Sequence, residues 1–179
     1  MSGIYDFNLN RVADWIRERE AKRVAVQLPE GLKVNATDII SGLESLTGSE
    51  IMLLADPCYG ACDFPPDFRR FSNALVQFGH SEMPCLSTSD DMLFVEVEID
   101  LDPLPLLEKV EGLEGRVGLA TTVQHLKTLD RVKRWLESRG LEVVIGRGDG
   151  RIAQPGQVLG CNVTSVSSIA DSVDRFLYI

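Results

Sequence analysis

The residues of this chain that could do chemistry are gathered in a few short segments. Six side chains could bind metals or exchange protons: Cys58, Cys62, Cys85, Cys161, His80 and His125. A glycine-rich stretch, Gly146–Arg151, adds two arginines and an aspartate. Thiolates and imidazoles bind metals, and guanidinium groups bind carboxylates and phosphates. Metal binding, redox chemistry and anion binding are therefore all open.

The spacing of the cysteines leaves their role undecided. Cys58 and Cys62 form a Cys-x-x-x-Cys pair, but no third cysteine lies close enough in the sequence to complete a locally held cluster. We expect Cys62 at the start of a helix, where backbone N–H groups favour a thiolate. Cys161 precedes a helix that we expect to begin near Thr164. Cysteines in loops are also often inert packing residues, which is the role expected for Cys85.

Composition and charge exclude several classes of protein. A chain of 179 residues with 44% apolar content is long enough for one or two globular domains. The formal net charge of -9 argues against binding to nucleic acid. No apolar run approaches the roughly 20 residues that span a bilayer, and the first 11 residues lack the pattern of a secretory signal. We expect a cytoplasmic protein without disulfides that does not contact membranes.

Apolar runs alternate with helical patterns along the chain. In the first half we expect strands at 23–28, 51–55, 74–78 and 92–99, with helices at 34–46 and from about 61 to 72. In the second half we expect helices at 106–110 and 126–138, with strands at 117–121, 142–145 and a buried one at 175–179. Strands that alternate with helices need crossover connections, which produce parallel sheets. The sequence predicts an α/β fold of two small three-layer domains of similar topology, residues 1–102 and 103–179.

Ligands of parallel sheets bind beyond the carboxyl ends of the strands. The segments that follow the predicted strands are rich in functional groups: Asp56–Asp63, Gly79–Ser81, Gln124–His125 and Gly146–Arg151. His80 and His125 could be acids, bases or ligands, or hydrogen-bonded structural groups. The arginines of the last segment could hold a carboxylate, phosphate or ribose, or the segment could be a solvated turn.

Six segments, in this order and spacing, carry a family resemblance: Val26–Leu32, Tyr59–Cys62, Phe78–Ser81, Gln124–His125, Ile145–Asp149 and Pro155–Cys161. They resemble the archaeal diphthamide synthases over almost the whole chain. The resemblance implies a homodimer of three similar α/β domains, each of which gives one cysteine to a central [4Fe-4S] cluster.

The resemblance also identifies cluster ligands. It implies that Cys62 and Cys161 bind the cluster, whereas Cys58 and Cys85 match no ligand of the family. It places the third ligand in a third domain that is absent from this sequence. We therefore expect the chain alone to be inactive or nearly so.

The implied reaction transfers the 3-amino-3-carboxypropyl group of S-adenosylmethionine to a histidine of translation elongation factor 2, the first step of diphthamide biosynthesis. An electron from the cluster would break the bond to the γ-carbon of the methionine part and produce a 3-amino-3-carboxypropyl radical. The sequence does not indicate the electron donor. The candidates for binding S-adenosylmethionine are His80, Ser81, Gln124, His125, Arg147, Gly148, Asp149 and Arg151. Either Arg147 or Arg151 would hold the methionine carboxylate.

Two other functions remain open. The chain could be a binding or assembly module of the same fold without catalysis. It could also be an unrelated thiol or zinc protein that uses Cys58 and Cys62. A dinucleotide-dependent dehydrogenase is disfavoured, because no Gly-x-Gly-x-x-Gly follows the first predicted strand.

Overall fold

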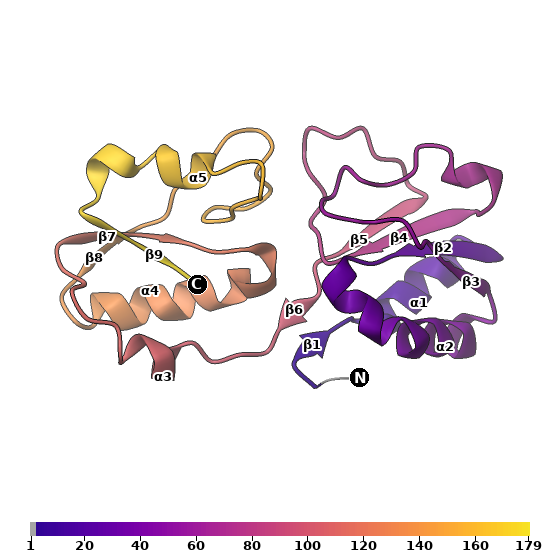
Figure 1. Cartoon of the computed structure of the whole chain (residues 1–179), viewed down its shortest axis with the longest axis horizontal. Helices are drawn as coiled ribbons and strands as arrows, with labels where there is room; N and C mark the ends of the chain where they lie inside the picture. The colour runs from indigo at the N-terminus through magenta and orange to yellow at the C-terminus, as the bar shows by residue number, and fades with distance from the viewer. Residues whose placement is uncertain (1–2) are drawn as a thin grey trace. The chain divides into compact units, whose positions relative to one another are not determined.

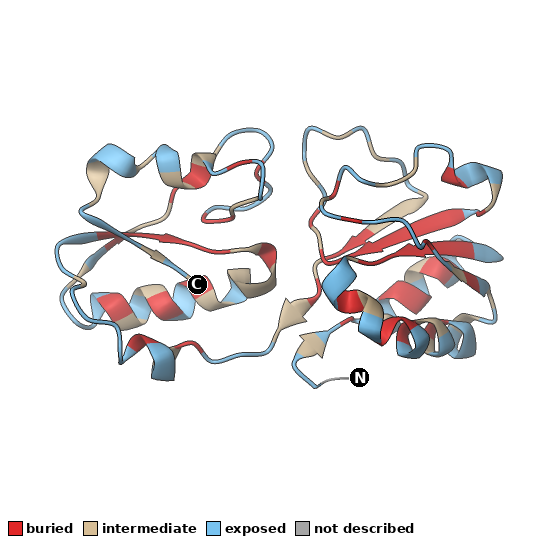
Figure 2. Ribbon diagram, viewed as in Figure 1, coloured by how far each residue is buried: buried red, intermediate tan, exposed pale blue. Residues whose placement is uncertain are grey.

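The computed structural model describes residues 3–179, which group into two compact units. Unit 1 contains the chain up to Glu82 together with Leu86–Glu98, and unit 2 contains Met83–Cys85 and Ile99–Ile179. Each unit has its own sheet and its own apolar core (Figure 1, Figure 2). The α/β class with parallel sheets is confirmed, and the domain boundary at residue 102 stays a prediction.

Unit 1 is built on four parallel strands in the order β3-β2-β4-β5 (Figure 1). The strands are β2 (Arg23–Gln27), β3 (Glu50–Leu53), β4 (Ala74–Phe78) and β5 (Met92–Val95). Between β3 and β4 the chain passes from one side of β2 to the other. The carboxyl ends of β2 and β4 therefore form a topological switch point, which is where ligands bind in open parallel sheets.

Two helices, α1 (Leu9–Glu18) and α2 (Ala36–Thr47), cover one face of this sheet (Figure 1). The 3-10 helix η1 (Glu30–Asn35) leads from β2 into α2. Because side chains alternate between the faces of a strand, Val24 and Val26 pack with Ile39 in the core beneath the helices. The intervening Ala25 points to the opposite face.

The opposite face of unit 1 is covered by a loop. Ala25 and Leu75 pack there against Phe68, from the single 3-10 turn η2 (Phe68–Arg70). The helix expected from about 61 to 72 is wrong, because residues 54–73 form turns and η2 only. Pro65 and Pro66 explain this result, since proline lacks an N–H donor and disfavours helical geometry in the residue before it. Cys62 consequently does not lie at a helix start.

Unit 2 has three parallel strands in the order β8-β7-β9. They are β7 (Arg116–Ala120), β8 (Glu142–Val144) and β9 (Arg175–Tyr178), and the helices are α3 (Leu104–Leu107), α4 (Leu129–Glu137) and α5 (Thr164–Ser167). The 3-10 helix η3 (Val123–Thr128) leads into α4, as η1 leads into α2. The order of β8, β7 and β9 repeats that of β3, β2 and β4.

The two faces of the second sheet differ in the same way as those of the first. Val117 and Leu119 pack against α4 residues, including Val132. The opposite face carries α5 (Figure 1), and a Cβ atom at Gly118 would lie 3.3 Å from Cδ1 of Ile169, the residue before the short 3-10 turn η4 (Ala170–Ser172). A Cβ atom at Gly118 would lie 2.4 Å from Cε1 of Phe176, so only glycine leaves room for that ring.

Two expectations for strands need correction. The strand at 175–179 is present as β9, but it is not buried: Phe176 and Tyr178 are exposed, because β9 pairs with β7 and no other strand lies beside it among the described residues. The expected strand at 92–99 is divided into β5 and β6 (Glu98–Ile99), since Val97 adopts a left-handed backbone with φ of 52°. The short β6 pairs with β1 (Tyr5–Asp6).

No helix within residues 3–179 combines the length and the apolar character needed to cross a bilayer.

The packing of α2 on the first sheet can be tested by truncating Ile39, which is completely buried. We expect Ile39→Ala to lower the free energy of unfolding by about 2–5 kcal/mol, since it removes buried methyl groups and leaves a cavity. The matched control is Val34→Ala in η1, where the side chain is 86% exposed and the expected change is within about 0.5 kcal/mol. Urea unfolding followed by circular dichroism measures both, and equal losses in the two variants would contradict the packing described.

Candidate functional site

Cys62 is the third residue of a four-residue turn, Gly60–Asp63, in the loop that follows β3. The N–H of Asp63 donates to the carbonyl of Gly60 at 3.1 Å and closes the turn. The Asp63 carboxylate accepts the N–H groups of Tyr59 at 2.6 Å and Gly60 at 2.8 Å. The backbone of the turn is therefore fixed by hydrogen bonds, while Cys62 itself is exposed.

Two buried glutamines of the sheet hold the ends of this turn. Gln27 of β2 and Gln77 of β4 are register partners, and they are 0% and 1% exposed. Gln27 Nε2 donates to the Asp63 carbonyl at 2.9 Å. Gln77 Nε2 donates to the Gly60 carbonyl at 3.3 Å and to Gln27 Oε1 at 2.9 Å. The first and last residues of the turn are thus both tied to the sheet.

Lys33 holds the start of the same loop. Its Nζ donates to the carbonyls of Ala55 at 2.9 Å and Asp56 at 3.2 Å, and pairs with the carboxylate of Glu30 at 2.5 Å. Lys33 belongs to η1, so the segment after β2 supports the loop after β3.

Cys161 occupies the same position in a second four-residue turn, Leu159–Asn162, after β8. Leu159 and Asn162 exchange two backbone hydrogen bonds, at 2.9 Å and 3.0 Å. Asn162 is buried, and its Nδ2 donates to Oδ1 of Asp149 at 2.8 Å while its Oδ1 accepts the N–H of Thr164 at 2.9 Å. Cys161 is exposed at the third position, as Cys62 is.

The segment Gly146–Arg151 is a folded loop rather than a free solvated turn. Arg151 Nη2 lies 2.9 Å from Oδ2 of Asp149, and hydrogen bonds from Arg151 and Asn162 hold the pKa of Asp149 at about 2. Gly148 has a φ of 75°, and a Cβ there would lie 2.6 Å from Cγ1 of Ile152, so only glycine fits. Arg147 is exposed and makes no side-chain hydrogen bond or ion pair with residues 3–179.

His80 and Ser81 follow β4 in unit 1, where Ser81 is buried. His80 Nδ1 lies 3.9 Å from Sγ of Cys58, which is 1% exposed. Burial lowers the pKa of His80 below its ordinary value, although its hydrogen bond with the Tyr59 backbone partly opposes this effect. Burial likewise raises the pKa of Cys58 to about 11. Both groups are therefore neutral near pH 7.

This environment counts against a zinc site at Cys58 and Cys62. Zinc binds the thiolate, and structural zinc sites use four protein ligands. Cys58 is buried, and no cluster of three or more His, Cys, Asp or Glu side chains among residues 3–179 is arranged to hold a metal ion.

Gln124 and His125 lie in η3, directly after β7, and both are half-buried. The His125 N–H donates to the Thr122 carbonyl at 3.1 Å, and its carbonyl accepts the Thr128 hydroxyl at 2.7 Å. The predicted site residues thus fall into two groups. Unit 1 carries Cys62, His80 and Ser81, and unit 2 carries Gln124, His125, Arg147, Gly148, Asp149, Arg151 and Cys161.

The sequence interpretation missed the residues that hold the two turns: Gln27, Gln77, Asp63 and Asn162. A signal for the glutamines was present, because Gln27 is the last residue of β2 and Gln77 is the polar residue of the otherwise apolar β4. Strand alternation places Gln27 on the face of Ala25, and Gln77 on the face of Leu75. Asp63 and Asn162 each follow a cysteine directly, in a type of residue that often fixes turns.

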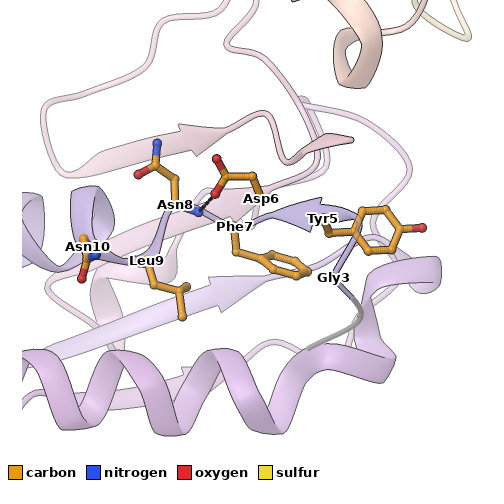
Figure 3. Close-up of a pocket in the computed structure, with 7 residues that line it drawn as sticks. All are labelled: Gly3, Tyr5, Asp6, Phe7, Asn8, Leu9 and Asn10. Carbon is orange, nitrogen blue, oxygen red and sulfur yellow. Dashed lines mark hydrogen bonds between the residues drawn. The ribbon is translucent and has the colours of Figure 1, made fainter. Parts of the chain in front are cut away.

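A cavity of about 290 Å³ lies elsewhere, at the N-terminal segment (Figure 3). Residues 5–10 and Gly3 line it, and Asp6 Oδ1 accepts the N–H of Asn8 at 2.8 Å beside it. None of the predicted site residues lines this cavity.

The reactivity of the four thiols tests the description of the Cys58 environment. With a pKa of about 11, roughly one Cys58 thiol in a thousand is ionised at pH 8, and its burial further limits access. We expect iodoacetamide to alkylate Cys58 at least about tenfold more slowly than the exposed Cys62, Cys85 and Cys161. Peptide mass spectrometry over time measures the four rates. In urea all four should react alike, and a native Cys58 that reacts as fast as the others would refute the buried thiol.

Comparison with known proteins gives consistent results. A family model of diphthamide synthesis proteins matches residues 28–179. The 2-(3-amino-3-carboxypropyl)histidine synthase of Pyrococcus horikoshii is 40% identical over 149 residues, which cover 79% of this chain and 43% of that protein. Subunit 1 of the human 2-(3-amino-3-carboxypropyl)histidine synthase is 30% identical over 177 residues, which cover 94% of this chain and 40% of the human one. The chain therefore spans less than half the length of these curated relatives.

Solved structures agree with the sequence matches. The crystal structure of Dph2 from Pyrococcus horikoshii superposes with a TM-score of 0.86 at 32% identity, covering 98% of this chain and 52% of that one. A second structure of Dph2 from Pyrococcus horikoshii, with a 4Fe-4S cluster, gives a TM-score of 0.84 at 31% identity with the same coverage.

Proposed function

This chain belongs to the diphthamide synthesis protein family, and from that membership we propose that it serves to transfer the 3-amino-3-carboxypropyl group of S-adenosylmethionine to a histidine of translation elongation factor 2. The names of the curated relatives state the group and its histidine acceptor. The donor, the protein substrate, a cytoplasmic location and a homodimeric assembly follow from the family resemblance. The observation that carries the proposal is the pair of matching turns, each of which exposes one cysteine.

In this proposal Cys62 and Cys161 are two ligands of a [4Fe-4S] cluster. The donor set fits, because such clusters are bound by cysteine thiolates and both cysteines are exposed on turns whose backbones are fixed. A related protein has been solved with a 4Fe-4S cluster. The family resemblance assigns the third ligand to a domain outside these 179 residues.

The cluster, when bound, supplies the electron that breaks the bond between the sulfonium sulfur and the γ-carbon of S-adenosylmethionine. The residues of this chain bind and orient that substrate. Arg147 is the better candidate to hold the methionine carboxylate, because the guanidinium of Arg151 is already paired with Asp149. Gln124 and His125, at the carboxyl end of β7, offer an amide and an imidazole to polar groups of the substrate.

Iron uptake tests the ligand assignment. We expect the anaerobically reconstituted chain to bind iron and sulfide in equal amounts, and we expect Cys62→Ala and Cys161→Ala each to lose most of that iron, since each removes a thiolate ligand. The measurements are iron and sulfide content together with the paramagnetic resonance spectrum of the reduced protein.

Cys85→Ala is the matched control, because Cys85 is also exposed but has no assigned role. Equal iron loss in all three variants would argue against specific ligands. A cluster-loaded chain that adds the mass of a 3-amino-3-carboxypropyl group to elongation factor 2, on incubation with S-adenosylmethionine and a chemical reductant, would rule out a binding module and would contradict the expectation that the chain alone is inactive.

The role of Arg147 has its own test. We expect Arg147→Ala to weaken the affinity of the reconstituted chain for S-adenosylmethionine about tenfold or more, because an arginine–carboxylate hydrogen bond is worth roughly 1.5–3 kcal/mol. Isothermal titration calorimetry measures the dissociation constant. Arg134→Ala, which alters another exposed arginine of unit 2, should leave it unchanged. The same affinity in both variants would remove Arg147 from the site.

A further inference from the structure

The buried amides of Gln27 and Gln77 form a short chain of hydrogen bonds that ends on the Cys62 turn. Gln77 Nε2 reaches the carbonyl of Gly60, Gln27 Nε2 reaches the carbonyl of Asp63, and the two side chains are joined at 2.9 Å. Gly60 and Asp63 are the first and last residues of the turn. Cys62 therefore lies between two points that are both tied to the centre of the sheet.

The two carbonyls fix the orientation of both amides. A main-chain carbonyl can only accept, so Gln27 must turn its NH₂ group toward Asp63 and its Oε1 toward Gln77. Gln77 must then direct its NH₂ group at Gln27 Oε1 and at the Gly60 carbonyl. The amides can satisfy the two carbonyls together in one arrangement only.

This arrangement leaves one polar atom unsatisfied. Gln77 Oε1 is buried and has no hydrogen-bond partner among the described residues. A buried acceptor without a partner is destabilising, and the neighbouring residues of this face, Ala25 and Leu75, are apolar. An apolar side chain at residue 77 would avoid this unsatisfied acceptor and would stabilise the core more. The glutamine is thus explained by its contact with the turn and not by the stability of the core.

We propose that Gln27 and Gln77 are positioning residues that hold the Cys62 turn in the conformation that presents its thiol to the iron-sulfur cluster. The inference rests on the proposed function for the identity of the bound group. The hydrogen bonds from Gln27 to Asp63 and from Gln77 to Gly60, which we call the clamp, are in contrast present in the iron-free chain and can be measured separately. Neither glutamine contacts substrate or cluster in this proposal, since each acts through the backbone of Gly60 or Asp63.

The clamp is tested with Gln27→Met and Gln77→Met, which keep the length of the side chain and remove the amide. Leu75→Met, a neighbouring buried residue of β4, is the matched control for altered packing. We expect the N–H of Asp63, which closes the turn, to exchange with deuterium about tenfold faster or more in each glutamine variant. The N–H groups within β2 and β4 should keep their rates, and the control should match the wild type.

The positioning role is tested on the same variants after reconstitution with ferrous iron and sulfide. We expect a chelator to remove iron about tenfold faster from the glutamine variants than from Leu75→Met, with a broadened paramagnetic resonance signal of the reduced protein. Circular dichroism establishes that each variant is folded. If Gln27→Met does not fold, Gln77→Met carries the test, because it also removes the unsatisfied acceptor.

The outcomes separate the two proposals. Unchanged exchange at Asp63 in folded glutamine variants would overturn the clamp. Faster exchange with wild-type iron release would overturn the positioning role. A wild-type chain that takes up no iron would instead overturn the proposed function, and the positioning of an iron ligand with it, while exchange in the iron-free chain would still decide whether the glutamines hold the turn.

Discussion

The positions of Cys62 and Cys161 depend on the hydrogen bonds made by the backbone of the loops that follow β3 and β8. A loop that leaves a sheet loses the ladder that satisfied its carbonyl and N–H groups, and such groups are rarely left unpaired when buried. In unit 1 the partners come from Gln27, Gln77 and Lys33. In unit 2 they come from Asn162 and Thr164. Polar side chains of the strands and of η1 in unit 1, and of the loop and α5 in unit 2, thus keep the backbone of each turn hydrogen-bonded while its cysteine is exposed.

The two units reach the same result by different contacts. Both have a central strand flanked by the next two strands in the same order, and both place a cysteine third in a four-residue turn after the second of these strands. The first turn is tied to the sheet by buried glutamines, whereas the second is tied to its own loop through Asn162 and Asp149. What the units share is the position of the turn, and not the residues that support it. A comparison of residue types between the two halves would therefore miss the similarity, whereas the alternation of strands and helices predicted two domains of similar topology.

The fold was largely predictable, because strands buried on both faces are continuous apolar runs and their alternation with helices implies parallel sheets. Residues 61–72 were misassigned because a helical pattern was weighed above the two prolines within it. The burial of β9 was misjudged because an apolar run does not reveal whether a neighbour covers it. For the site, spacing left Cys62 and Cys161 open, and only the family resemblance selected them. The roles of Gln27 and Gln77 could not be predicted, since alternation gives the face of a side chain but not the loop that packs on it.

In the loop after β3, two cysteines that are four residues apart differ in burial: Cys58 is buried and Cys62 is exposed. Cys58 and Cys62 are equal in sequence terms, and both could compete for a metal. Burial raises the pKa of Cys58 to about 11, so its thiol stays protonated at neutral pH. Cys62 is exposed by its turn. In this loop only Cys62 is therefore accessible to a metal, because Cys58 is buried. The position of Cys62 is fixed by hydrogen bonds to the backbone of Gly60 and Asp63, and not by contacts of its own side chain.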